Sequence, residues 1–353
     1  MSWLLAFLGF AALIILHELG HFAAAKAVGM RVERFALFFP PLLGRVRRGE
    51  TEYAIGAVPL GGYVKITGMN PAEEIPPEHA HRAYYRQPVW KRIVVIAAGP
   101  AVNIVLAFLL LWVLFWSQGT TNSNRVDSLQ PGTPAAALLQ PGDRILAVDG
   151  ERGGPEVLRD QIASHRCAGE PRKGCEASTP VELTVVRDGR EQTVTATPFF
   201  NPELGRTQLG FGFGEDVGPV HAADLGADQM WALTTGTVST IAGVFEAEKR
   251  KEISGVVGSY ETTRQAIKLS WSTAVFLLAL ISLSLGVINL FPFLPLDGGH
   301  IFWALAEKVR GKPIPFGVME RAGFVGFALV IGLFAIGLTN DIGRLTGEGF
   351  GLR

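Results

Sequence analysis

Four stretches of the chain are apolar over a length that suits a membrane-spanning helix. They cover residues 3–28, 93–116, 269–296 and 322–338, and the last of them is the shortest. A helix needs about 20 mostly apolar residues to cross the hydrocarbon core of a bilayer. The pattern therefore predicts a polytopic α-helical membrane protein with about four transmembrane helices.

The residues between the second and third apolar stretches carry a different pattern. In residues 124–214, short runs alternate between apolar and polar positions, and Pro-Gly or Asp-Gly pairs separate them. This pattern predicts a separate α+β domain over residues 117–214. Residues 225–245 have apolar positions at near-helical spacing, which predicts an amphipathic helix within a linker over residues 215–268. The membrane-spanning parts are then residues 1–116 and 269–353.

A glycine-rich extended segment follows the first apolar stretch. Residues 53–64 alternate between apolar and other positions, and glycines interrupt residues 61–69. We expect a membrane-associated β-hairpin here, because extended backbone at membrane depth is tolerated only where it lines a cavity or is packed in protein. Its open edge would offer hydrogen bonds to an unwound substrate, and an ordinary surface hairpin is the alternative. The candidate substrate-binding residues of this edge are Gly61, Gly62, Tyr63, Val64 and Lys65.

The composition agrees with a membrane protein. Hydrophobic residues make up 48% of the 353 positions and charged residues only 18%, which is unusual for a soluble enzyme. The formal net charge is zero, which argues against a nucleic-acid partner and leaves the lipid bilayer as the expected surrounding. Residues 1–16 contain no Lys or Arg, so we expect no cleaved signal peptide there.

The basic residues predict the orientation in the bilayer. Residues 31–92 contain ten Lys or Arg against six acids, so we expect that loop in the cytoplasm. Residues 307–321 contain four basic residues against two acids, which agrees. Both chain termini and residues 117–268 are then extracytoplasmic.

A metal-binding motif lies inside the first apolar stretch. His17 and His21 are four residues apart and share one face of a helix, so both can bind one metal ion while Glu18 lies beside it as a base. Ionisable residues in a lipid-spanning segment are costly to desolvate and indicate function by default. The alternative is a helix end at the membrane surface with solvated His and Glu side chains.

The third metal ligand must come from another part of the chain, because a catalytic zinc ion typically has three protein ligands and one open position. Asp297 is the first charged residue after a long uncharged stretch, and prolines and glycines around it break the helix. Its carboxylate can therefore turn toward the first stretch. His300 is the rival ligand, and we prefer Asp297 because it lies at the break.

The α+β domain contains two further candidate features. Residues 131–150 resemble part of a PDZ domain, a fold that binds extended chain by adding it to a sheet edge. The Gly-Phe alternation of residues 209–214 is either a peptide-binding loop or a plain edge strand. Cys167 and Cys175 lie in a turn-rich insertion, where an oxidising compartment would let them form a disulfide; two free thiols are the alternative.

The chain resembles the site-2 protease family of intramembrane zinc metalloproteases, and most closely the bacterial regulator-of-sigma-E protease branch. The family's zinc motif falls on His17, Glu18 and His21, and its Leu-Asp-Gly motif falls on residues 296–298. Its membrane-associated β-hairpin falls on residues 61–69. The resemblance covers nearly the whole chain.

Two asparagine motifs of the family are also present. The Asn-x-x-Pro motif falls on Asn289 and Pro292, and the Gly-Pro-x-x-Asn motif ends at Asn103. Asn289, Pro292 and Asn103 are candidates to bind substrate, because the two asparagines are polar groups in otherwise apolar stretches. The two amides would hydrogen-bond the substrate backbone or the oxyanion; interhelical hydrogen bonding is the alternative, above all for Asn103.

The resemblance implies a function in the bacterial inner membrane. The expected partners are single-pass membrane proteins, such as anti-sigma factors or remnant signal peptides, that a site-1 protease has shortened first. The expected cofactor is Zn²⁺, with the active site near the cytoplasmic side. Two other classes remain as alternatives, namely a catalytically silent membrane-anchored PDZ scaffold and a zinc transporter. Bound zinc, a cleavage assay and zinc transport into vesicles separate the three.

Overall fold

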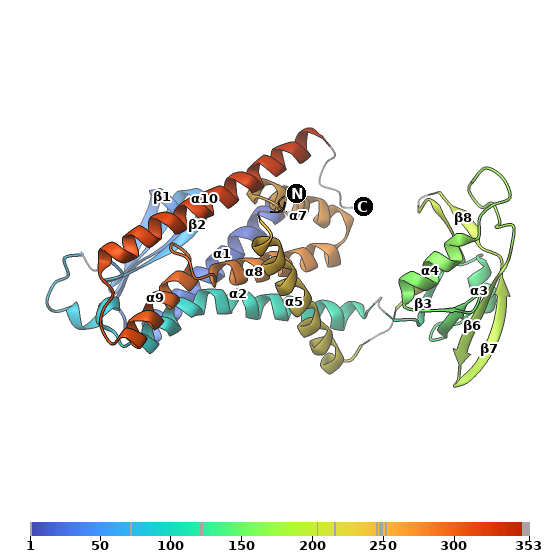
Figure 1. The fold of residues 1–353 in the computed structure, drawn as a ribbon, viewed down its shortest axis with the longest axis horizontal. Coiled ribbons are helices and arrows are strands. Elements are labelled where there is room, and N and C mark those ends of the chain that lie inside the picture. The colour runs from blue at the N-terminus through green and yellow to red at the C-terminus, as the bar shows by residue number, and fades with distance from the viewer. Residues whose placement is uncertain are drawn as a thin grey trace. The chain divides into compact units, whose positions relative to one another are not determined.

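The computed structural model divides the chain into two compact units. Residues 1–112 and 225–353 form the first unit, and residues 113–224 form the second (Figure 1). We call them the membrane unit and the α+β unit. The residues that the structure describes are 2–70, 73–120, 123–202, 204–214, 217–244, 246, 250 and 253–347.

Among the described residues, four helices are long and apolar enough to cross a membrane. They are α1 (Ser2–Ala27), α2 (Val89–Gln118), α8 (Trp271–Asn289) and α10 (Phe316–Thr346). The expected membrane-spanning helices are thereby confirmed, with two changes of length. The third ends at Asn289 rather than at residue 296, and the fourth is longer than residues 322–338. Only a minority of the side chains of these helices are buried within the protein, as expected where lipid covers the helices.

The end of α8 is set by two prolines. Pro292 and Pro295 lack a backbone N–H and cannot continue the helical hydrogen bonds, so the chain leaves the helix there. It resumes as α9 (Asp297–Arg310), whose first residue is the candidate ligand. This break therefore starts a new helix at Asp297.

Two further helices, α5 (Pro219–Ala242) and α7 (Val256–Leu269), precede α8 in the sequence. The amphipathic pattern expected over residues 225–245 corresponds to α5, and α7 packs against α1 and α8. The fully buried Asp341 of α10 accepts hydrogen bonds from the backbone N–H groups of Gly255 at 3.1 Å and Gly258 at 2.7 Å. These groups lie at the start of α7 and have no partner within that helix, so α10 holds this end in place.

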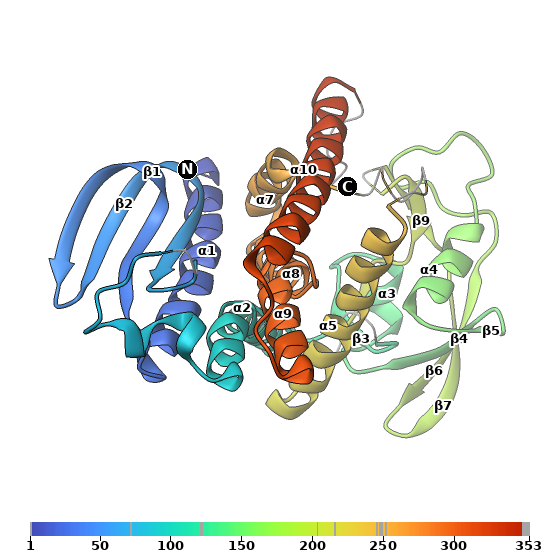
Figure 2. The same cartoon turned by 60° about the vertical axis from the view of Figure 1, so that its left-hand side comes forward.

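The segment between α1 and α2 is dominated by a long antiparallel hairpin. Its strands are β1 (Val32–Arg48) and β2 (Thr51–Ile66). Both strands bend, so that the two halves of each strand form separate paired segments of the sheet. Buried residues such as Met30, Val32 and Ile66 pack with residues of α1 and α2. Figure 2 shows the sheet beside α1.

The pairing of the hairpin places one segment at a sheet edge. Residues 32–37 pair on one side with residues 52–55 and on the other with residues 62–66. Residues 42–48 pair with the beginning of β2. Within the described residues, the segment 62–66 therefore has a paired strand on one side only. We call it the edge segment.

Ion pairs fix the turn of the hairpin to neighbouring elements. Glu50 accepts hydrogen bonds from Arg82 at 2.6 Å, in the short helix η1 (Ala80–Arg82), and from Lys26 at the end of α1 at 2.6 Å. The Arg82 guanidinium, followed by the Lys26 ammonium, holds the pKa of Glu50 at about 2. A second short helix, η2 (Tyr84–Arg86), leads into α2.

The α+β unit encloses an apolar core. Its main sheet has the strand order β5-β4-β6-β7, and the pairs β10-β3 and β8-β9 flank it. Thirteen buried apolar residues, including Ile145, Leu158 and Leu183, form the core between the strands and α4. The strands are β3 (Val126–Leu129), β4 (Arg144–Val148), β5 (Glu151–Arg152), β6 (Val181–Arg187), β7 (Arg190–Ala196), β8 (Phe199–Asn201), β9 (Arg206–Gln208) and β10 (Phe211–Phe213). The helices are α3 (Pro134–Leu138) and α4 (Pro155–Ser164).

Two further links stabilise this unit. The buried Asp143 accepts two hydrogen bonds from Arg187, at 2.8 and 2.6 Å, and one from the backbone N–H of Gln140. The Arg187 guanidinium is the main reason why the pKa of Asp143 lies below its ordinary value. Cys167 and Cys175 form a disulfide in the structure, with Cα atoms 6.2 Å apart.

Candidate metal centre

Helix α1 presents two imidazole groups on one face. His17 and His21 are one turn apart, 7% and 8% exposed, and their Nε2 atoms are 3.2 Å apart. This is the arrangement that the His-x-x-x-His spacing predicts for an α-helix.

Asp297 completes the cluster from the start of α9. Its Oδ2 atom lies 3.2 Å from Nε2 of His17 and 3.3 Å from Nε2 of His21. Across the described residues, these three form the one group of His, Cys, Asp or Glu side chains whose ligand atoms converge. His300, the rival ligand, lies outside this group. The helix break therefore brings the carboxylate of Asp297 to His17 and His21, which lie far away in the sequence.

The geometry and chemistry of the cluster fit a zinc ion. At zinc–ligand distances of about 2.0–2.2 Å, two ligands of a tetrahedral site lie about 3.3–3.6 Å apart. The three ligand atoms are 3.2, 3.2 and 3.3 Å from one another, close to that spacing. Oδ2 of Asp297 is buried and makes no hydrogen bond of good geometry within the described residues, as expected of an atom reserved for a metal. Two imidazole nitrogens and one carboxylate oxygen are a donor set that zinc prefers.

Helix α2 orients one of the ligands. Nδ1 of His21 lies 2.9 Å from the backbone carbonyl oxygen of Val95, which can only accept a hydrogen bond. Nδ1 therefore carries the proton, and the lone pair of Nε2 is directed to the cluster. Gly99 lies directly against the His21 ring, and a Cβ atom at this position would overlap it. The backbone of α2 thus sets both the tautomer and the position of this ring.

The candidate base lies between the metal cluster and the hairpin. Glu18 follows His17 on α1 and is partly buried. Its Cγ atom would be only 2.9 Å from a Cβ atom added at Gly62, so the backbone of the edge segment lies against this side chain. An extended chain paired with the edge segment would therefore run past Glu18.

The other hairpin candidates have structural contacts of their own. The Phe39 ring lies over Gly61 and stacks on Tyr63, with ring centroids 6.3 Å apart. The Tyr63 hydroxyl accepts a hydrogen bond from Arg34 at 3.2 Å. Val64 packs against the buried cluster that joins the hairpin to α1 and α2. These residues shape the edge segment, and its backbone is what remains available to bind a chain.

The side chain of Lys65 also has a structural role. Its ammonium group forms ion pairs with Glu33 at 2.7 Å and Glu73 at 2.9 Å. The side chain is therefore committed within the protein, and a contribution of Lys65 to substrate binding would come from its backbone.

The two asparagines occupy different surroundings. Asn103 on α2 is fully buried, and neither atom of its amide has a hydrogen-bond partner within the described residues. Its backbone carbonyl accepts a hydrogen bond from Ser282 of α8 at 2.9 Å. The Asn289 amide donates to the carbonyl of Leu285 on its own helix at 3.0 Å, and Pro292 lies exposed in the break that follows. Among the described residues, the Asn103 side chain therefore forms no interhelical hydrogen bond.

Sequence reasoning missed one contributor to the site. The carbonyl of Val95 orients His21, yet a backbone atom leaves no mark in the residue pattern. The tight contact of Gly99 with His21 could have been suspected, because a glycine within a membrane helix indicates close packing.

Comparison with known proteins gives one consistent answer. The model of peptidase family M50 matches residues 5–333. The chain is 33% identical over 348 residues to a protein of Clostridium perfringens, covering 97% of this chain and 98% of the relative. It is 32% identical over 365 residues to a protein of Nostoc sp., covering 98% and 97%. A protein of Rhizobium meliloti is 29% identical over 364 residues, covering 95% and 94%. All three relatives carry the name "Putative zinc metalloprotease".

Proposed function

The chain belongs to peptidase family M50, and from this premise we propose that it is an intramembrane zinc metalloprotease of the site-2 type. It hydrolyses peptide bonds within the transmembrane segments of single-pass membrane proteins. The observation that carries this proposal is the contact of Gly62 with Glu18, which puts an open strand edge beside the base of a metal cluster. A transporter or a silent scaffold has no need of this arrangement.

The chemistry divides between the metal and one carboxylate. His17, His21 and Asp297 would hold a zinc ion, which when bound would lower the pKa of its water ligand to about 7 and polarise the scissile carbonyl. Glu18 accepts the proton of the attacking water and then donates it to the leaving amine. Its partly buried position beside the edge segment keeps it within reach of a peptide bound there.

The substrate must unwind before it is cut. A peptide bond inside a helix is shielded by the hydrogen bonds of the helix. In a substrate strand paired with the edge segment, hydrogen bonds to the backbone of β2 replace the helical ones. The buried amide of Asn103, which has no partner among the described residues, and the amide of Asn289 are candidates to bind the substrate backbone or the oxyanion. Pro292 contributes by keeping the chain between α8 and α9 non-helical.

The charge of the loops supports an orientation of the protein in the membrane. The basic loop between α1 and α2 favours an arrangement with the hairpin in the cytoplasm of a bacterium and both chain termini outside it. The metal cluster then lies near the cytoplasmic side of the inner membrane, and residues 117–214 are extracytoplasmic. Anti-sigma factors or remnant signal peptides shortened by another protease are the expected substrates.

The α+β unit is, in this proposal, a PDZ-like domain that selects substrates by size. Its order of short strands around α4 suits such a domain, and its residues are not part of the metal cluster. It would hold off a substrate with a bulky external domain and admit one that has been trimmed.

Deletion of residues 124–214 tests this selection. We expect cleavage of a short membrane stub to persist and cleavage of the untrimmed substrate to begin, with both measured in proteoliposomes of zinc-loaded protein. Loss of stub cleavage in a deleted protein that still binds zinc would refute the size selection.

Proline substitution tests the role of the edge segment. Tyr63→Pro and Lys65→Pro remove backbone donors from the edge, so we expect cleavage of both the stub and the untrimmed substrate to fall. Tyr63→Ala and Lys65→Ala are the matched controls, because they change the side chain and keep the backbone N–H. Equal loss in the alanine and proline variants would show that the side chains, not the strand edge, are needed.

The same proteoliposomes separate the alternatives. A protease binds zinc and cleaves the stub without moving zinc across the bilayer. Zinc uptake into the vesicles without cleavage would favour a transporter, and neither activity would favour a scaffold.

A further inference from the structure

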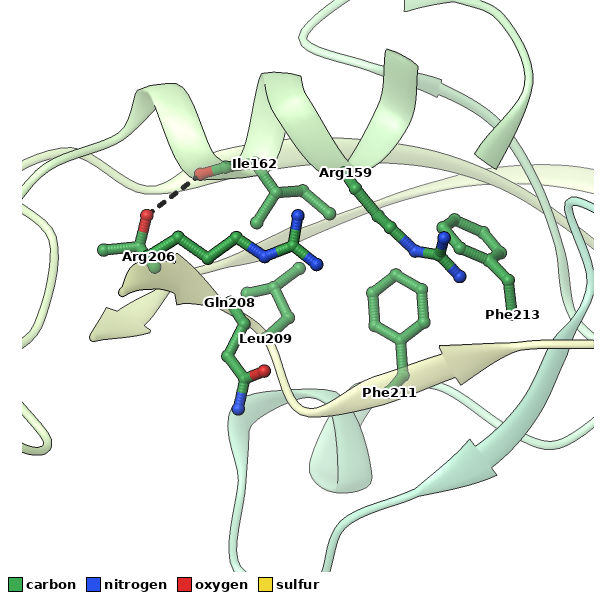
Figure 3. A pocket seen from close by; sticks show the side chains of 8 residues that line it. Arg159, Ile162, Arg206, Gln208, Leu209, Phe211 and Phe213 are labelled. Atoms are coloured by element: carbon green, nitrogen blue, oxygen red, sulfur yellow. Dashed lines mark hydrogen bonds between the residues drawn. The ribbon is translucent and has the colours of Figure 1, made fainter. Parts of the chain in front are cut away.

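A groove in the α+β unit lies between α4 and the chain from β9 to β10 (Figure 3). Its apolar lining comes from Ile162 of α4 and from Leu209, Phe211 and Phe213 on the opposite side. The Phe211 and Phe213 rings contact each other edge to face, with centroids 5.0 Å apart. The groove thus has an aromatic surface along one side.

Hydrogen bonds of Thr207 join the two sides of the groove. The buried Thr207 of β9 donates a hydrogen bond to the carbonyl of His165 at 2.7 Å, directly after α4. Its hydroxyl also approaches the carbonyls of Ile162 and Ala163. One side chain therefore ties the strand to the end of the helix, so the groove does not need to form on binding.

One wall of the groove offers a strand edge. β10 pairs with β3, and among the described residues it has no second neighbouring strand. Extended peptides bind to such edges by adding a strand, with side chains entering the adjoining groove.

Two arginines give the groove its charge. Arg159 of α4 and Arg206 of β9 both extend along the groove (Figure 3). Arg159 lies over the Phe213 ring, 5.2 Å from its centroid, and neither guanidinium forms an ion pair within the described part of the chain. Two unpaired guanidinium groups over an apolar surface attract a carboxylate, which each can bind through two N–H groups.

We propose that this groove binds an extended acidic peptide segment, which pairs with the edge of β10 and places an internal Asp or Glu side chain between Arg159 and Arg206. The proposal deepens the proposed function, on which it rests, because it names the chemistry of the external segment that the protease recognises. The two arginines come from the middle of α4 and from β9, so they lie along the path of a bound chain. This placement suits a side-chain carboxylate rather than the terminal one.

The test is a peptide-binding measurement on the full chain. The Glu18→Gln variant in detergent, loaded with zinc, is titrated with fluorescein-labelled eight-residue peptides that have an amidated end. The peptides share alternating Val and Thr residues and differ at one central position, which is Glu, Gln or Lys. We expect the Glu peptide to bind at least about tenfold more tightly than the Gln peptide, and the difference to shrink at high salt.

Charge reversal in the protein gives the matched comparison. The double substitution of Arg159→Glu with Arg206→Glu should reverse the preference, so that the Lys peptide binds more tightly than the Glu peptide, and either substitution alone should remove the preference. Arg190→Glu, at an exposed position of β7, is the control and should leave the preference unchanged. The double substitution of Arg159→Gln with Arg206→Gln tests the same contact if a charge-reversed variant does not fold, and it should remove the preference without reversing it.

Two outcomes would overturn the proposal. Equal affinity for the Glu and Gln peptides would show that the arginines do not select a side-chain carboxylate. Binding that requires a free terminal carboxylate instead of the central Glu would assign the groove to chain ends. Cleavage of a short stub by the wild-type protein is measured separately. Absence of that cleavage would refute the proposed protease activity, whereas the peptide-binding measurement alone tests the proposed role of the groove.

Discussion

The membrane unit and the α+β unit differ in the polar side chains that they bury, although both bury apolar residues. In the membrane unit the buried residues include two histidines, the Asn103 amide and the Asp341 carboxylate. The α+β unit instead encloses thirteen apolar residues, and its main buried charge, Asp143, is paired with Arg187. Lipid is as apolar as the side chains of a membrane helix, so burying an apolar side chain between two such helices gains little over leaving it in lipid. Apolar burial therefore cannot by itself specify how membrane helices pack.

The difference shows where each unit carries function. Polar groups inside the membrane unit are costly, and they are retained where they bind a metal, orient a ligand or end a helix. The α+β unit is stabilised by its core and displays its candidate binding groups at the surface. Substitutions that affect one unit should therefore leave the other intact.

The largest expected effect is that of Glu18→Gln. The ligands remain, so we expect zinc content close to wild type, while loss of the base lowers cleavage of a short stub by about 10²- to 10⁴-fold. Metal analysis of the purified protein and a stub-cleavage assay give the two values. Glu156→Gln, an exposed acid on α4 in the other unit, is the control and should cleave normally. Wild-type turnover by Glu18→Gln would rule out the mechanism.

Asp297→Ala should affect metal binding as well as activity. It removes one of three ligands. Loss of a hydrogen-bond partner of a ligand lowers metal affinity by about 10- to 100-fold, so loss of the ligand itself should lower zinc affinity by more than that. Competition with a chelator of known affinity measures this change. Unchanged zinc affinity would redirect attention to His300.

Gly99→Ala tests the packing of the metal site. The added methyl group would overlap the His21 ring, so the ring must move and we expect about 10- to 100-fold lower stub cleavage together with weaker zinc retention. Gly169→Ala in the α+β unit is the matched control, because a Cβ atom there meets nothing within 4 Å. Normal zinc retention and cleavage by Gly99→Ala would mean that α2 does not hold the ring.

Asp143→Asn should have the smallest effect on catalysis and act on the α+β unit alone. It breaks a largely buried ion pair, and because the Arg187 side chain is 25% exposed we expect a loss of about 2–3 kcal/mol, below the about 3–5 kcal/mol of a fully buried pair. Limited proteolysis of the full chain would report this loss as faster cutting within residues 123–214. Stub cleavage should not change.

The same ion pair predicts a pH dependence. The pKa of Asp143 is lowered in the folded state, chiefly by Arg187, so the stabilisation is complete above the ordinary Asp pKa of about 4. It is lost as the pH falls from there through the lowered pKa. Protease resistance of the wild-type α+β unit should therefore decline below about pH 4, and Asp143→Asn should show a weaker decline. An identical decline in both proteins would assign the acid sensitivity to other groups.

Much of the membrane unit could be predicted from the sequence. Apolar length alone identified the four long helices, and the four-residue spacing of His17 and His21 fixed their common face because an α-helix has one geometry. Prolines in the sequence also indicated the break before Asp297. Helix ends were less certain, as α8 and α10 show. The apolar run of α8 continues into residues that are not helical, whereas α10 includes polar residues beyond its apolar run.

Long-range contacts were beyond the sequence. The alternation of residues 53–64 indicates a strand, but it does not reveal that β1 and β2 bend into four paired segments or that Gly62 comes to lie against Glu18. The disulfide between Cys167 and Cys175 is different, since a sequence separation of eight residues makes the loop short and its closure cheap in chain entropy.

The sequence by itself determined the helices, the two histidines on one face and the residue types that suit zinc, because these depend on local geometry and chemistry. Only the tertiary structure decided that Asp297 rather than His300 joins the cluster, that the Val95 carbonyl orients His21, and that the edge segment lies beside Glu18. These contacts join residues far apart in the chain, and the free energy that selects them comes from packing whole elements together.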